Sequence, residues 1–404
     1  MLGSRRRWLR FLGWTVLTLT IVLTGLAIEA WPALGGGIEG ERLERMQQSP
    51  QYRDGAFQNV LPRVDSAFTV AAAWAFLTDQ TPAQVPEEPL ATVQRTGEDF
   101  ADPRDSLRVT WLGHSTVLVE LDSARILIDP VWGERVSPSR FIGNRRFAPA
   151  PLALEDLPPL DAVVISHDHY DHLDMPTVRQ LANADLRFAD GVPRWVVPLG
   201  VGAHLEHWGV APSAITELDW WDSTPVAGLE LVSTPARHFS GRFLNDQSAT
   251  LWTGWAILGH DQRVFYSGDT ALTPEFAEIG ARYGPFDLTL IESGAYDASW
   301  SDVHLGPEQA VAAHQMVRGR VLMPVHWGMF DLAMHGWTEP AERIRVAAAA
   351  RGIPVALPRP GESVTPDSYP SDRWWPERPW QTAVEAPANS TNLPDSVRAL
   401  IPMP

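Results

Sequence analysis

The sequence predicts an α/β fold in which two mixed sheets pack face to face and helices cover their outer sides. Three observations lead to this prediction. The chain has 404 residues, 45% of them hydrophobic, so it can bury a large core. From residue 107 onward, short apolar segments alternate with Gly, Asp and Pro, as strands and turns do. The strands fall into two successive groups, each ending in helices, and two stacked sheets satisfy that order.

The first group of apolar segments is expected to form one sheet. Its predicted strands are short runs of apolar and β-branched residues, at 107–113, 115–122, 124–130, 161–167, 194–200 and 215–221. Two helices are expected between these strands, at 175–184 and 201–209.

The second group is expected to form the other sheet. Its predicted strands lie at 229–238, 250–259, 263–269, 286–293 and 320–326. Helices are expected at 273–284 and 306–317, and a last helix begins near Thr338, a favourable N-cap residue. Gly352 marks the end of that helix.

The chain divides into four regions by composition. Residues 1–31 are a membrane anchor or a signal, and residues 32–104 are a linker and irregular extension rich in Pro, Gly and charge, with one helix expected at 67–77. Residues 105–364 form the domain with the two sheets. Residues 365–404 form a proline-rich, irregular tail.

The N-terminal region resembles a single-pass membrane anchor. An uncharged run from Phe11 to Ile28 follows four arginines and is just long enough to span a bilayer, which takes roughly 17–25 apolar residues. Arginines before the span predict a bacterial inner-membrane protein with a periplasmic body. The alternative is a signal peptide cleaved after Ala30, which would leave a periplasmic protein. The arginine cluster also resembles a twin-arginine export signal.

Charge and cysteine content exclude several classes of function. The formal net charge is −17, which argues against a nucleic-acid partner because phosphate contacts need a basic face. The chain has no cysteine, so it has no disulfide, thiolate ligand or cysteine nucleophile. Any transition-metal site must therefore use His, Asp or Glu.

The segment SHDHYDHLD, residues 166–174, directly follows a predicted buried strand and is rich in metal-ligand residue types. In an extended chain His167 and His169 point the same way and can bind one metal ion. If the chain then turns into a helix, Asp171 and His172 face a second point nearby. Imidazole and carboxylate together suit zinc or another borderline divalent ion. A polar loop with chance histidines does not account for so many ligand-type side chains.

Further ligands are available at the ends of later strands. His238, Asp269 and His326 each follow a predicted strand, and Gly268 permits a tight turn beside Asp269. The two oxygens of Asp269 can bridge two ions, which in such sites lie about 3.5–4 Å apart. Together these residues complete two metal sites.

These segments resemble the metallo-β-lactamase superfamily, whose signature is H-x-H-x-D-H. More narrowly, the chain is similar to the phospholipase D group that hydrolyses N-acylphosphatidylethanolamine, over residues 52–363. The resemblance is carried by VTWLGHSTVLVE, SHDHYDHLD, ELDWWD, STPARHFSGR, LWTGWAILG, FYSGDT, GPFDLTLIESGAY, VHLGPEQAV and MPVHWGMF. It implies the metallo-β-lactamase fold, an αββα sandwich.

The resemblance also implies roles for individual residues. One zinc ion would be held by His167, His169 and His238, and the other by Asp171, His172 and His326, with Asp269 bridging. Tyr170 and His304 match residues that contact the phospholipid head group. The sequence departs from the mammalian enzyme at Glu292 and Ser293, which leaves the head-group preference open.

The implied activity is hydrolysis of a membrane phospholipid, giving phosphatidic acid and an N-acylethanolamine by attack of a metal-bound hydroxide. Asp171 or Asp269 would orient the attacking water or accept its proton, and His304 would assist the phosphate or the leaving group. Two alternatives stay open: a hydrolase of lactones or β-lactams, and a non-catalytic protein that holds a phosphate ligand through metals. The sequence also leaves a homodimer open.

Three other histidines are candidate functional residues. His114 is expected either to support a ligand or substrate, or to be a buried histidine with its hydrogen bonds satisfied. His204 and His207 lie three apart on a predicted helix without an acidic partner nearby in sequence, so a solvated helix face is expected for both.

Overall fold

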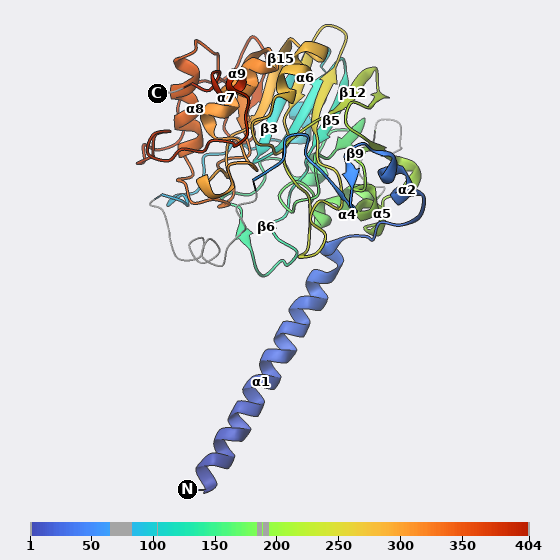
Figure 1. Cartoon of the computed structure of the whole chain (residues 1–404), viewed down its shortest axis with the longest axis vertical. Coiled ribbons are helices and arrows are strands. Elements are labelled where there is room, and N and C mark those ends of the chain that lie inside the picture. Colours follow the sequence, from blue (N-terminus) through green and yellow to red (C-terminus); the bar gives the residue numbers. More distant parts are fainter. Residues whose placement is uncertain (1, 65–82, 103, 184–187, 189–193, 403–404) are drawn as a thin grey trace.

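Two mixed sheets form the centre of the body in the computed structural model, which describes residues 2–64, 83–102, 104–183, 188 and 194–402 (Figure 1). In spatial order the first sheet contains β10 (Ile215–Leu218), β9 (Trp195–Pro198), β8 (Ala162–Val164), β5 (Ala124–Ile128), β4 (Thr116–Leu121), β3 (Arg108–Gly113) and β17 (Ser363–Val364). The strands from β10 to β5 are parallel, and the pairs from β5 to β17 are antiparallel.

The second sheet continues the chain after the first. Its order is β11 (Ser223–Val226), β12 (Leu229–Thr234), β13 (Gly254–Leu258), β14 (Arg263–Tyr266), β15 (Phe286–Glu292) and β16 (Gly319–Val325). Pairs from β11 to β14 are antiparallel, whereas β14, β15 and β16 are parallel. The sequence did not predict β11, because it contains Pro225, and proline is tolerated in a sheet only at an edge or a bulge.

Alternating side chains of the central strands build two separate parts of the core. Val117 and Val119 of β4 lie in the cluster between the sheets, together with Trp255 of β13, whereas Leu118 packs in the cluster under the outer helices. This alternation follows from the two-residue period of a strand. Both faces are buried, which explains why these strands read as continuous apolar runs.

Helices cover the outer face of each sheet. The first sheet is covered by α4 (Met175–Ala182) and α5 (Gly202–His207), and the second by α6 (Glu275–Tyr283), α7 (Pro307–Met316) and α8 (Glu339–Ala349). Thr338 occupies the N-cap position of α8, although its side chain makes no capping hydrogen bond. Gly352 follows the helix with φ of 65°.

The segment between residues 31 and 64 is more regular than the sequence indicated. It contains α2 (Gly40–Gln48) and a hairpin of β1 (Tyr52–Arg53) and β2 (Ala56–Phe57). Met46 and Phe57 are buried in a cluster with Trp252, so the segment belongs to the core of the body. The sequence missed this because α2 is strongly polar and buries only Met46. The helix predicted at 67–77 lies outside the described residues.

Helix α1 (Leu2–Ala30) projects from the body as a separate rod (Figure 1). By length and composition it could cross a membrane, and no residue in its most apolar window is buried.

At the other end of the chain, the tail is mostly irregular. It ends in α9 (Asp395–Arg398) and packs Leu393 and Val397 against the second sheet's outer helices. A small hairpin of β6 (Arg135–Val136) and β7 (Asn144–Arg145) lies near the base where α1 joins the body.

Candidate metal centre

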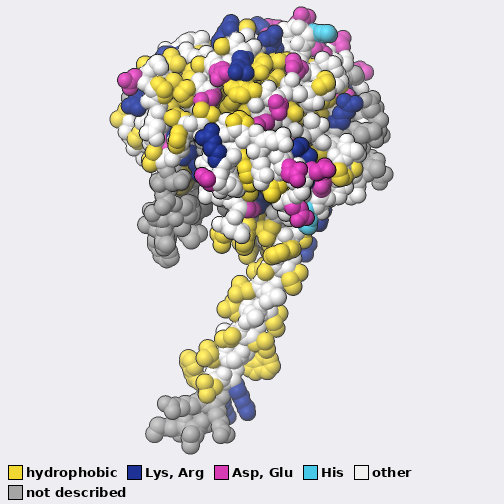
Figure 2. Space-filling model, turned by 45° about the vertical axis from the view of Figure 1, so that its right-hand side comes forward, with side chains coloured by type: hydrophobic (Ala, Val, Ile, Leu, Met, Phe, Trp, Pro, Cys, Tyr) yellow, Lys and Arg dark blue, Asp and Glu magenta, His cyan; other side chains and the backbone are white. Residues whose placement is uncertain are grey.

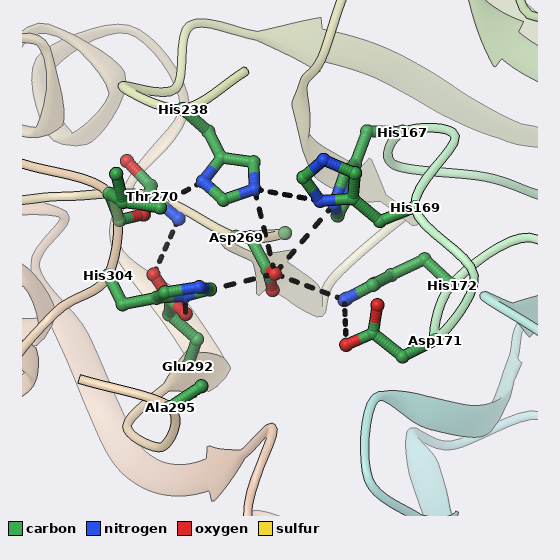
Figure 3. A network of polar contacts seen from close by, with 12 residues as sticks. His167, His169, Asp171, His172, His238, Asp269, Thr270, Glu292, Ala295 and His304 are labelled. Carbon is green, nitrogen blue, oxygen red and sulfur yellow. Dashed lines mark hydrogen bonds and ion pairs between the residues drawn. The ribbon is translucent and has the colours of Figure 1, made fainter. Parts of the chain in front are cut away.

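All seven predicted metal ligands gather at the ends of strands. Figure 3 shows the ligands that it labels around Asp269. The segment from His167 to His172 follows β8, and the other ligands follow the second sheet's strands: His238 after β12, Asp269 after β14 and His326 after β16. Gly268, with φ of 57°, makes the turn before Asp269, and a Cβ atom there would lie 2.5 Å from the Thr253 carbonyl oxygen. Glycine is therefore required at this position.

The first ligand group contains His167, His169, His238 and Asp269, whose ligand atoms all lie within 4.8 Å of one another. The Nδ1 atom of His169 is 2.9 Å from Nε2 of His167 and 3.2 Å from Nε2 of His238. Three imidazole nitrogens thus converge on one point. Asp269 Oδ2 lies 3.7 Å from His167 Nε2 and 3.8 Å from His238 Nε2.

The second ligand group contains His114, Asp171, His172 and His326, again within 4.8 Å. The same oxygen of Asp269 lies 3.2 Å from His172 Nε2 and 3.1 Å from His326 Nε2. Asp269 therefore reaches both groups, which is the position that a bridging carboxylate needs.

The protonation of the clustered histidines and the unpaired atoms of the cluster favour the binding of cations. Burial lowers the pKa of His167 and His238 well below the ordinary value, so both imidazoles are neutral donors. Burial acts to lower the pKa of His326, but Asp269 and Asp171 together outweigh it and raise this pKa to about 10. The second group thus stabilises positive charge, and Asp269 Oδ1 and His172 Nε2 are buried without a hydrogen-bond partner. A donor set of imidazole and carboxylate fits zinc-like ions.

Asp129 supports the second group and was missed by the sequence analysis. Its carboxylate accepts a hydrogen bond from Tyr266 Oη at 2.5 Å and lies 2.7 Å from Nδ1 of His172. Ser166 donates to it through both its backbone N–H and its hydroxyl. Such a contact orients an imidazole for metal binding. The available signal was an acidic residue directly after a buried strand, at the end of β5.

His114 supports a predicted ligand and is not a buried histidine with its hydrogen bonds satisfied, because its Nδ1 atom has no hydrogen-bond partner. It is buried, and burial together with nearby His326 lowers its pKa to about 3. Its Nε2 atom lies 2.9 Å from Asp171 Oδ2, so it supports a predicted ligand.

His304 and Glu292 form a pair beside the two groups (Figure 3). Nδ1 of His304 lies 2.8 Å from Glu292 Oε2, and the other carboxylate oxygen of Glu292 accepts hydrogen bonds from the backbone N–H of Thr270 and Leu305. Glu292 is buried, which raises its pKa. The sequence analysis linked Glu292 only to head-group preference, whereas its contact is with His304.

Tyr170 is partly buried and joins none of the ligand groups found among the described residues. Its hydroxyl donates to the Arg242 carbonyl oxygen at 2.7 Å, and the Arg242 guanidinium lies 4.0 Å from the centre of its ring. Burial raises the pKa of Tyr170 to about 12, so the phenol stays protonated.

The beta-lactamase superfamily domain matches residues 124–327, half of the chain and the segment that carries all the predicted ligands. The chain belongs to this superfamily. It is 44% identical to an uncharacterized protein of Mycobacterium tuberculosis over 364 residues, covering 86% of this chain and 93% of the relative. It is 38% identical to N-acyl-phosphatidylethanolamine-hydrolyzing phospholipase D 1 of Caenorhabditis elegans over 267 residues, covering 63% of this chain and 73% of the relative.

A solved structure from Veillonella parvula, titled a possible metal-dependent hydrolase, shares the fold. It is 18% identical and has a TM-score of 0.51 over 64% of this chain and 99% of that chain. The αββα sandwich predicted from the sequence is therefore the metallo-β-lactamase fold. With the superfamily match and the clustered His and Asp residues, this protein is a metal-dependent hydrolase of the superfamily.

In this superfamily member, the prediction that His204 lies on a solvated helix face is wrong. His204 is buried, its Nε2 lies 3.4 Å from Asp168 Oδ2, and its Nδ1 accepts a hydrogen bond from the Gly36 N–H at 3.2 Å. His207 is exposed, as expected. The acidic partner of His204 lies 36 residues earlier in the chain, so sequence spacing could not reveal it.

Proposed function

We propose that this superfamily member is a di-zinc phosphodiesterase that hydrolyses a membrane phospholipid as N-acylphosphatidylethanolamine phospholipase D does. The observation that carries the proposal is the position of Asp269 between two histidine-rich groups, with the His304 imidazole beside both. The similarity to the Caenorhabditis elegans phospholipase supports the choice of reaction.

The two groups would hold one zinc ion each: the first through His167, His169 and His238, the second through Asp171, His172 and His326, with Asp269 shared. When bound, the ions supply Lewis acidity, which activates water near neutral pH and stabilises negative charge on phosphate oxygens. His114 orients Asp171, and Asp129 orients His172.

His304 and Tyr170 are proposed to act on the substrate. Glu292 holds Nδ1 of His304, so Nε2 is the atom left to reach the substrate. The Glu292 carboxylate orients the imidazole, whose Nε2 donates a hydrogen bond to a phosphate oxygen or to the leaving oxygen. Asp171 or Asp269 orients the attacking water. Tyr170 contacts the head group.

The substrate lies in a bilayer, and α1 is proposed to anchor the protein in an inner membrane with the body in the periplasm. Support comes from the exposed, apolar surface of α1. A reporter fused to the C-terminus should give a periplasmic signal, and the mature chain should keep Arg7. N-terminal sequencing that starts at Trp31 would replace the anchor with a cleaved signal.

The reaction is tested by mass spectrometry of the products. Purified protein should convert N-acylphosphatidylethanolamine to phosphatidic acid and an N-acylethanolamine, and chelation should abolish this. The variant His304→Ala should lower phosphodiester turnover while keeping both metals, because His304 is not assigned as a ligand. Release of free fatty acid, or opening of lactones or β-lactams with every phosphodiester left intact, would contradict the proposal.

A further inference from the structure

Two loop tips on the body expose adjacent large hydrophobic side chains to solvent. The first tip, between β6 and β7, exposes 58% of Phe141 and 57% of Ile142. The second tip follows metal-ligand candidate His238 and exposes 56% of Phe243 and 94% of Leu244. Leu244 is more exposed than any other large hydrophobic residue that the structure describes. Paired apolar residues at loop tips indicate contact with something other than water.

Both tips are attached to the chain where α1 ends. Ser139 Oγ and the Arg140 N–H donate to the carboxylate of Glu29 at 2.7 and 3.1 Å, which ties the first tip to the last turn of the helix. Arg242 Nε donates to the Ala33 carbonyl oxygen at 2.8 Å, which ties the second tip to the residues just after it. Figure 2 shows hydrophobic side chains along α1 and on the body where the helix joins it.

We propose that the two tips, Phe141–Ile142 and Phe243–Leu244, insert into the bilayer beside α1 and hold the metal centre against the lipid surface. This inference rests on the proposed membrane anchor. The occupant is lipid because the contacts at Glu29 and Ala33 lie only one and five residues after Ile28, the last residue of the apolar run, which is about 10 Å or less along a helix. Arg140, with 77% of its side chain exposed, is placed to meet lipid phosphates.

The second tip is directly connected to the metal centre. Between His238 and Leu244, the Phe239 ring lies 4.6 Å from the ring of His169, and the Gly241 N–H donates to Asp168 at 2.7 Å. The carbonyl oxygen of Arg242 holds the Tyr170 hydroxyl. A phospholipid lifted from the bilayer at this tip would therefore meet Tyr170 on its way to the metals. The membrane contact would deliver substrate as well as hold the body in place.

The absence of cysteine makes a direct test simple. Leu244→Cys, Ile142→Cys and a control, Val346→Cys on α8, are each labelled with an environment-sensitive fluorophore. Val346 is 49% exposed, and α8 lies away from the base where α1 joins the body. The full chain is reconstituted in phosphatidylethanolamine–phosphatidylglycerol vesicles that contain spin-labelled lipids. The labels at residues 244 and 142 should be quenched and the label at 346 should not.

Flotation of the same vesicles separates failure of this inference from failure of the anchor. If the chain floats with the vesicles but the tip labels are quenched no more than the control, the insertion is wrong and the anchor stands. If the chain does not float, both are wrong. Neither result depends on the phospholipase reaction, which product analysis tests separately.

A kinetic test uses the double change Phe243→Ser and Leu244→Ser. Turnover of lipid embedded in vesicles should fall by about tenfold or more, the scale expected when two large apolar side chains lose their burial. Turnover of the water-soluble diester bis(4-nitrophenyl) phosphate should stay unchanged, and Val346→Ser should change neither. Equal losses on both substrates would mean that the tip shapes the metal centre, and no loss on vesicles would mean that it does not contact lipid. Either result would overturn the proposal.

Discussion

The two ligand groups of the metal centre share a loop and the carboxylate of Asp269, yet only the second also contains the carboxylate of Asp171. In the first group, burial and neighbouring imidazoles lower the pKa of His167. In the second, burial also disfavours charge on His172, but Asp269 and Asp171 outweigh it and raise its pKa well above the ordinary value. One loop of six residues, His167–His172, therefore supplies two imidazoles to the first group and a carboxylate with an imidazole to the second. Such asymmetry predicts two metal sites of unequal affinity.

The largest effect is expected where the groups meet. Asp269→Asn should lower the metal content of both sites and reduce activity by more than the about 100-fold that loss of an outer supporting residue can cost. Asp168→Asn is the matched control, because Asp168 belongs to none of the ligand groups among the described residues and accepts hydrogen bonds from Gly241 and Thr250 instead. Metal analysis and turnover measure the difference. Equal losses from the two changes would refute the bridging role.

Removing one ligand from either group should empty that site and leave the other occupied. His238→Ala should empty the first site and His326→Ala the second, so each variant should bind close to one ion per chain instead of two. Metal content after dialysis measures this. If either change releases both ions, the sites are not separable in the way their geometry indicates.

A residue that only orients a ligand should contribute less to metal affinity than the ligand itself. Asp129→Asn weakens the contact that orients His172, and we expect a loss of about 10–100-fold in metal affinity at the second site only. Competition with a metal-binding dye would measure the affinity of each site. A loss confined to the first site would contradict the assignment of Asp129 to the second.

The smallest effect on activity is expected from His204, behind the first group. Burial raises the pKa of Asp168, but its contacts with His204 and Gly241 lower it below the ordinary value. His204→Leu removes one partner of this buried carboxylate and the acceptor of the Gly36 N–H, and should lower the free energy of unfolding by about 1–3 kcal/mol. Metal content should not change. The control is His207→Leu, at an exposed position, whose free energy of unfolding in urea denaturation should stay within about 0.5 kcal/mol of the parent's. Equal losses of stability in the two variants would show that the His204 contact adds no stability.

Much of the candidate centre could be predicted from sequence because its ligands follow strands. A carboxylate or imidazole directly after a buried strand lies at a sheet edge, and this placed His238, Asp269 and His326 together without coordinates. The same rule would have found Asp129. The pairing of Glu292 with His304 could not be predicted, because it depends on how the loop before α7 returns over the end of β15.

By itself, the sequence determined the αββα order of elements, the apolar span of α1 and the ligand chemistry of a cysteine-free site. These follow from local periodicity and residue type. Only the tertiary structure decided which carboxylate faces which imidazole, and that Ala33, just after α1, contacts Arg242 in the loop that follows His238. It also set His114, Asp129 and His326 in left-handed backbone conformations, with φ of 54°, 43° and 64°. Such conformations cost about 1–3 kcal/mol each and persist only where the surrounding packing holds them, which no local sequence signal records.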